Sequence, residues 1–151
     1  MVKTATQAHD VVARVVDPEI PVLTIEDLGV LRGVDQVGDT IVVTITPTYS
    51  GCPAMGQIED DITRALGRAG YTDIRIDVVY QPAWTTEWMS DEARAKLEDF
   101  GIAPPTAPSD VRCPKCREGE ARLIAQFGST ACKALMVCSV CGDPFDYFKE
   151  H

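Results

Sequence analysis

The chain has 151 residues, of which 45% are hydrophobic and 25% are charged, and a formal net charge of −9. These proportions are typical of a folded globular protein with one or two small domains. The negative charge argues against general binding to nucleic acid or anionic membranes, because both favour Lys and Arg. No apolar run approaches the roughly 20 residues that span a bilayer, and residues 1–7 lack the core of a secretory signal. We therefore expect a cytoplasmic protein.

The first hundred residues alternate helix and strand patterns. Apolar residues at helical spacing predict helices, and β-branched or alternating runs predict strands. Gly70 and Gly101 are C-terminal stops, and Pro18 limits the first helix. In chain order the pattern predicts a helix over 8–16, strands over 30–34 and 40–46, a helix over 53–69, a strand over 74–78 and a helix over 90–101. This order predicts an α/β (α+β) fold, with a small sheet covered by helices.

The chain divides into an α/β domain over residues 1–102, a linker over 103–112 and a C-terminal unit over 113–151. The linker contains three prolines in residues 103–110, a composition that is typical of semi-rigid connections. The C-terminal unit is too short to fold on a hydrophobic core alone. We therefore expect a further stabilising element there.

Four cysteines supply that element as two Cys-x-x-Cys pairs separated by 21 residues. Such pairs provide a tetrahedral S4 site, and the strand-like residues 122–127 and 133–137 between them predict a β zinc ribbon. A rubredoxin-type iron site, a labile iron–sulfur cluster and paired disulfides are the alternatives. The predicted ligands of a structural zinc ion are Cys113, Cys116, Cys138 and Cys141.

Two further cysteines lie outside these pairs. Cys132 is interpreted as a small core residue, as a substitute ligand or as a contact point for transferred iron. Cys52 precedes Pro53, which fits the first position of the second predicted helix. A thiol at that N-cap would have a lowered pKa and could contact a metal or cluster transiently. The alternative is a cysteine that packs at a helix start without reacting.

Asp17 and Glu19 lie in a proline-stiffened Asp-Pro-Glu-Ile-Pro segment. Their carboxylates can bind a cation or orient a partner, or the segment is simply a rigid helix exit. Trp84 and Trp88 can anchor an interface or cap the core. His9 and His151 fall in no motif, and we find no phosphate-binding glycine loop or open metal site in the sequence. We therefore expect no independent catalysis.

Several of these segments, taken in order, resemble a known family. Residues 17–21, 27–30 and 44–54 resemble the MIP18 (DUF59) family of iron–sulfur assembly factors, over about residues 5–100. With residues 82–90 and the cysteine-rich tail, the whole chain resembles the PaaD (PaaJ-type) family of the bacterial phenylacetyl-CoA epoxidase system. One departure is Arg117-Glu118, which follows the first cysteine pair where we expect a small Gly-Ser type turn.

The resemblance implies an accessory maturation factor in aerobic phenylacetate degradation. Such a protein would assist iron–sulfur cluster or iron assembly or repair in the epoxidase, with the [2Fe-2S] reductase as leading client and the di-iron oxygenase as the other. Cys52 matches the family's reactive cysteine, and Asp17 and Glu19 match family positions. The resemblance also implies a homodimer through the first domain. The alternative function is a non-catalytic docking subunit of the epoxidase with a purely structural zinc.

Overall fold

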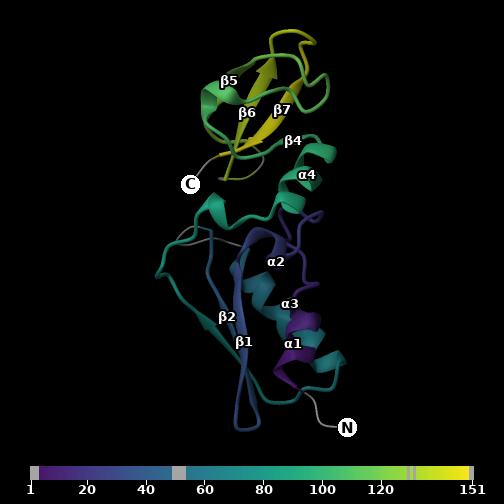
Figure 1. Cartoon of the computed structure of the whole chain (residues 1–151), viewed down its shortest axis with the longest axis vertical. Helices are drawn as coiled ribbons and strands as arrows, with labels where there is room; N and C mark the ends of the chain where they lie inside the picture. The colour runs from purple at the N-terminus through teal and green to yellow at the C-terminus, as the bar shows by residue number, and fades with distance from the viewer. Residues whose placement is uncertain (1–3, 49–53, 129, 131, 150–151) are drawn as a thin grey trace. The chain divides into compact units, whose positions relative to one another are not determined.

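The computed structural model describes residues 4–48, 54–128, 130 and 132–149. The chain forms two compact units, Met1–Met89 and Ser90–His151, and each has a sheet of its own (Figure 1). Three strands form the first sheet and four form the second. The mixed α+β class predicted from the sequence is confirmed. In the described part of the chain no helix is long and apolar enough to cross a bilayer.

The first unit is built on a β-hairpin followed by a helical crossover. Gly38, with a φ of 63°, provides the tight turn that makes the first two strands antiparallel. The crossover helix α3 then brings the third strand parallel to the second, which gives the order β1-β2-β3. The elements are α1 (Ala5–Val12), α2 (Ile25–Leu28), β1 (Leu31–Val37), β2 (Thr40–Ile45), α3 (Met55–Arg68), β3 (Ile74–Val78) and a 3-10 turn, η1 (Thr86–Trp88).

The core of this unit lies between the sheet and two helices. Helices α1 and α3 lie side by side on one face of the sheet (Figure 1). The apolar face predicted for α3 is confirmed, because Ile58, Ile62 and Leu66 are at most 2% exposed. Val43 and Ile45 of β2 are fully buried. Thr4 starts α1 with a capping box, which satisfies backbone N–H groups that lack helical partners.

The end of α1 and the start of α3 both differ from the sequence prediction. Helix α1 ends at Val12, before the predicted end at residue 16, because the following chain closes back on itself: Ile25 donates a backbone hydrogen bond to Val15 O at 2.8 Å. Val15 points inward at 7% exposure and Val16 outward at 41%. Helix α3 begins at Met55, two residues after the start predicted at Pro53.

The two tryptophans pack on the beginning of the sheet. Trp84 is 6% exposed and its Nε1 donates a hydrogen bond to Leu28 O at 2.9 Å. Arg32 lies over the Trp88 ring, 3.8 Å from its centroid. Gly29, at φ 80°, lets the Trp88 backbone approach, since a Cβ there would come closer than 3.0 Å to Trp88 Cβ and O. The core-capping interpretation therefore describes this segment.

The second unit is a four-stranded sheet of order β4-β7-β6-β5 with one helix. This helix begins next to Ser90, close to the predicted start, and Ser90 caps it; Gly101 at φ 88° follows its end, as predicted. Strand β6 pairs antiparallel with both β5 and β7, and β4 pairs parallel with β7. The elements are α4 (Asp91–Asp99), β4 (Ile102–Ala103), η2 (Pro108–Asp110), β5 (Ala121–Ala125), β6 (Lys133–Cys138) and β7 (Pro144–Phe148).

The segment predicted as a linker contributes to the core of this second unit. Ala103 and Val111 are each 1% exposed and belong to one apolar cluster with Met136, Phe145 and Tyr147. Strand β4 is only two residues long, so it leaves no periodic pattern in the sequence. Contacts of this kind explain why the units separate at Met89 and Ser90, ahead of the predicted boundary at residue 102.

Candidate metal centre

The four cysteines of the two Cys-x-x-Cys pairs converge in the second unit. Their Sγ atoms all lie within 4.8 Å of one another, with 3.7 Å between Cys113 and Cys141 and 3.6 Å between Cys116 and Cys138. Four sulfurs placed tetrahedrally at about 2.3 Å from one ion are about 3.8 Å apart. A disulfide requires about 2.05 Å. The separations therefore fit one ion in an S4 shell and do not fit paired disulfides.

Backbone N–H groups point at the sulfurs. Val140 N and Cys141 N each lie 3.3 Å from Cys138 Sγ, and Cys116 N lies 3.5 Å from Cys113 Sγ. A thiolate accepts such bonds better than a thiol does. The N–H of Cys141, helped by that of Val140, lowers the pKa of the Cys138 thiol to about 6, although burial opposes the shift. These N–H groups therefore favour the charged form of the Cys138 sulfur.

The two pairs have the same backbone geometry. Arg117 N donates to Cys113 O at 2.8 Å, and Gly142 N donates to Cys138 O at 3.1 Å. Both residues that follow a pair are left-handed, with φ of 63° at Arg117 and 76° at Gly142. Arg117 therefore adopts the same turn geometry as Gly142, although small residues are expected there from the sequence. As a non-glycine residue at positive φ, Arg117 is strained.

Gly119 closes the site from the side of the first pair. A Cβ at this position would lie closer than 3.0 Å to Cys138 Sγ, 3.4 Å from Cys116 Sγ and 3.3 Å from Val140 Cβ. Its carbonyl accepts from Cys113 N at 3.1 Å. The next residue ties the two pairs together, because Glu120 O accepts hydrogen bonds from both N and Oγ of Ser139 at 2.9 Å.

The cluster is a structural type of site. Cys113 and Cys138 are 1% and 2% exposed and belong to the core cluster, whereas Cys141 is exposed. Four thiolates fill a tetrahedral shell, so a bound ion has no open position for a substrate. An ion held there would crosslink the start of β5 to the β6–β7 turn and would stabilise the unit.

Cys132 lies apart from this group. It is 5% exposed, and its Sγ lies 3.0 Å from Thr130 Oγ1. It is not among the described residues that gather around the common centre. Its neighbour Lys133 is also buried, with Nζ 4.0 Å from an Asp146 carboxylate oxygen. The surroundings are those of a buried residue, and a contact with iron stays a prediction.

The remaining candidates belong to the first unit. Asp17 is 8% exposed, and its Oδ1 accepts hydrogen bonds from Glu19 N at 2.7 Å and Ile20 N at 3.1 Å. This carboxylate therefore organises its own loop. Cys52 lies outside the described residues, so its predicted role remains a prediction.

Sequence reasoning missed Gly119 and the N–H donors of Val140 and Cys141. A glycine three residues after a Cys-x-x-Cys pair was the available signal for the first. Backbone donors leave no sequence signal, because any residue other than proline supplies them.

Comparison with known proteins gives two domain matches and several relatives. Residues 6–78 match the family "Iron-sulfur cluster assembly protein", and residues 101–149 match the "PaaD zinc beta ribbon domain". An Escherichia coli (strain K12) protein, named as a subunit of "Putative 1,2-phenylacetyl-CoA epoxidase", is 46% identical, over 95% of this chain and 93% of its own length. A Porphyromonas gingivalis "Fe-S protein maturation auxiliary factor" is 39% identical, over 55% of this chain and 80% of its own.

A solved structure supports the fold of the first unit. The DUF59 domain from Bacillus anthracis superimposes with a TM-score of 0.57 at 31% identity, covering 62% of this chain and 90% of that one. The sequence resemblance to both families is thereby confirmed. The chain belongs to the same family as the Escherichia coli epoxidase protein, with an iron–sulfur cluster assembly domain followed by a PaaD zinc β-ribbon.

Proposed function

We propose that this protein is an accessory maturation factor of the phenylacetyl-CoA 1,2-epoxidase system. It would assist assembly or repair of an iron–sulfur cluster or iron in a component of that system, with the [2Fe-2S] reductase as client. The observation that carries the proposal is the joint occurrence of both matched domains in one chain. The Escherichia coli relative over nearly the full length is named as part of an epoxidase, and relatives of the first domain are named as Fe-S maturation factors.

The two units have different roles in this proposal. The four-cysteine site holds zinc, which stabilises the ribbon and does no chemistry, because its shell is complete. The transient thiolate contact with iron or a cluster is assigned to Cys52, which precedes α3 by three residues in the sequence. Asp17, Glu19 and Cys132 are secondary candidates for that contact.

The experiment compares the client from cells that carry different forms of this protein. The reductase is purified anaerobically from a strain without the gene, complemented with wild type, Cys52→Ala or Cys52→Ser, and its iron and acid-labile sulfide are measured. We expect low cluster occupancy with both variants, because a hydroxyl does not replace a soft thiolate as an iron ligand. Glu118→Ala, an exposed substitution, is the control and should restore full occupancy.

The docking function makes a different prediction in the same experiment. If this protein only holds the epoxidase components together, Cys52→Ala leaves the reductase cluster at the wild-type level. That result, with the variant folded by circular dichroism, would contradict the maturation role and support a docking role.

A further inference from the structure

Three of the five described cationic side chains of the first unit line one groove. Residues 1–89 contain thirteen Asp and Glu against six Lys and Arg, so its surface is mainly acidic. Arg75 pairs with Asp77 at 2.8 Å, and Arg32 lies over Trp88. The other three described arginines line a single groove of about 290 Å³ beside α1 and α3.

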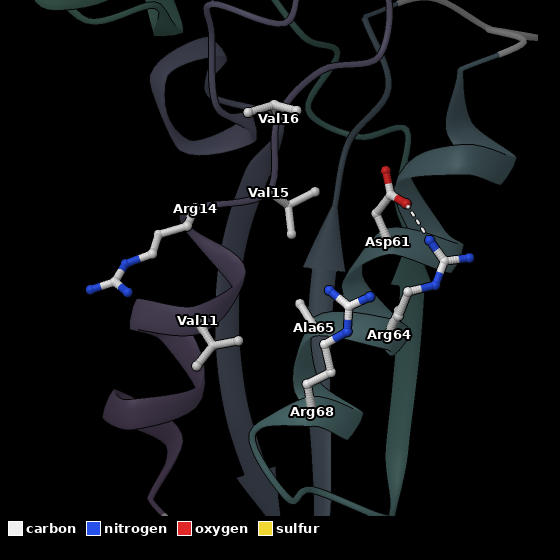
Figure 2. A pocket seen from close by; sticks show the side chains of 8 residues that line it. All are labelled: Val11, Arg14, Val15, Val16, Asp61, Arg64, Ala65 and Arg68. Atoms are coloured by element: carbon white, nitrogen blue, oxygen red, sulfur yellow. Dashed lines mark hydrogen bonds and ion pairs between the residues drawn. The ribbon is translucent and has the colours of Figure 1, made fainter.

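The groove is both basic and apolar because both of its walls carry residues of the two kinds. Asp61, Arg64, Ala65 and Arg68 are spaced i, i+3, i+4, i+7 on α3, whereas Val11 lies in the last turn of α1 and Arg14 and Val15 follow in the turn after its end. Residues with this spacing share one side of a helix. The early end of α1 leaves Val16 at the upper rim, 41% exposed. Figure 2 shows the guanidinium of Arg68 below Val15, between the two helices.

The charges of the groove are largely uncompensated. Arg64 Nη1 lies 3.3 Å from Asp61 Oδ1, but the arginine is 58% exposed and the carboxylate also accepts from Gln57 at 2.8 Å. Among the described residues, Arg14 and Arg68 have no carboxylate within ion-pair distance. Figure 2 shows Arg14 extending outward from the end of α1. Exposed arginines of this kind are mobile enough to turn toward an incoming anion, and they bind carboxylates in a bidentate manner.

We propose that this groove docks an acidic segment of a partner protein, with at least two carboxylates flanking an apolar side chain. The carboxylates would pair with Arg64, Arg68 and Arg14, and the apolar side chain would cover Val11, Val15 and Ala65. Charge complementarity selects this occupant, because the positive groove is set in an otherwise acidic unit that repels acidic partners elsewhere. The apolar residues Val11, Val15 and Ala65 favour a peptide segment over a free anion, because an inorganic anion has no apolar group to pack against them.

The test uses the full chain in its metal-loaded form and a defined probe. The ¹H–¹⁵N spectrum is titrated with the peptide acetyl-DLEELD-amide at 50 mM NaCl, and with acetyl-NLQQLN-amide as the uncharged match. We expect the acidic peptide to shift resonances of residues 11–16 and 61–68, and to bind at least about tenfold more tightly than the neutral one. Raising NaCl to 500 mM should weaken binding several-fold, because exposed charges are screened.

Variants then assign the binding to these arginines. Arg64→Ala/Arg68→Ala should weaken binding of the acidic peptide by about tenfold or more, since two of the three arginines that pair with its carboxylates are lost. Arg75→Ala removes an exposed arginine of the same unit outside the groove and should leave the affinity unchanged. Both changes are at exposed side chains, and retention of the wild-type spectrum elsewhere shows that the fold is kept.

Three results would overturn the proposal. These are no shifts at millimolar peptide, equal binding of the neutral peptide, or equal losses in Arg64→Ala/Arg68→Ala and Arg75→Ala. Inorganic pyrophosphate is titrated in parallel, and tighter binding of this ion at the same residues would show a small-anion site instead. The readout requires no client or cluster, so it is independent of the maturation function.

Discussion

Gly119→Ala tests whether the second unit is organised around a metal ion. The new Cβ would lie closer than 3.0 Å to Cys138 Sγ and 3.4 Å from Cys116 Sγ. Carbon contacts need about 3.5 Å or more, so this sulfur has to move by more than about 1 Å. Metal sites tolerate only about 0.2 Å in their bond lengths. Either Cys138 leaves the shell or the segment that carries Gly119 shifts.

The size of the effect follows from the number of ligands. A structural S4 site contributes about 10–16 kcal/mol of binding free energy, so loss of one of four comparable ligands costs about 3 kcal/mol. That cost corresponds to a zinc affinity on the order of 100-fold weaker. Competition with a chromophoric chelator measures this affinity directly.

The neighbouring exposed residue provides a matched control. Glu118→Ala adds no atom near a sulfur and should bind zinc as the wild type does. If the zinc affinity of Gly119→Ala is also within threefold of the wild-type affinity, the close packing of Gly119 against Cys138 does not constrain the metal. That result would refute the geometry argued for this site.

Three further predictions concern local strain, protons and the core. Arg117→Gly relieves left-handed strain of about 1 kcal/mol and should raise the melting temperature of the ribbon, whereas Gly142→Ala at the matching position should lower it. Acidification should release the metal, because protons compete with the ion for the four thiolates. The N–H groups of Cys141 and Val140 lower the pKa of the Cys138 thiol to about 6, so its charged form is stabilising above the ordinary thiol pKa of 9.0 and is lost as pH falls through 6; metal binding that does not depend on pH would be inconsistent with thiolate ligands. Trp84→Phe leaves Leu28 O without its donor and should destabilise the first unit by about 1–2 kcal/mol in urea unfolding, and an unchanged midpoint would show that this bond is not stabilising.

The fold was predictable where one local pattern determines an element. Ile58, Ile62 and Leu66 repeat at helical spacing, and residues 40–45 are β-branched with a tight turn before them, so both elements follow from their own sequence. Strand β4 and the boundary after Met89 were not predictable in the same way. They depend on pairing with β7, which is about forty residues away in the sequence.

The candidate sites also differ in how much of them the sequence predicts. The spacing of four cysteines predicts their convergence, because a Cys-x-x-Cys turn places both sulfurs on one side. The early end of α1 depends on a backbone hydrogen bond from Ile25 N to Val15 O. Because this bond involves no side chain, the sequence pattern does not predict it. The sequence pattern therefore does not predict that Arg14, Arg64 and Arg68 line one groove beside that end.

The most direct test of the maturation role is the metal and acid-labile sulfide content of this protein, purified without oxygen as wild type and as Cys52→Ala. We predict one zinc per chain in both forms, and additional iron or sulfide in the wild type alone. Zinc alone in both, with no iron acquired on reconstitution, would contradict cluster handling through Cys52.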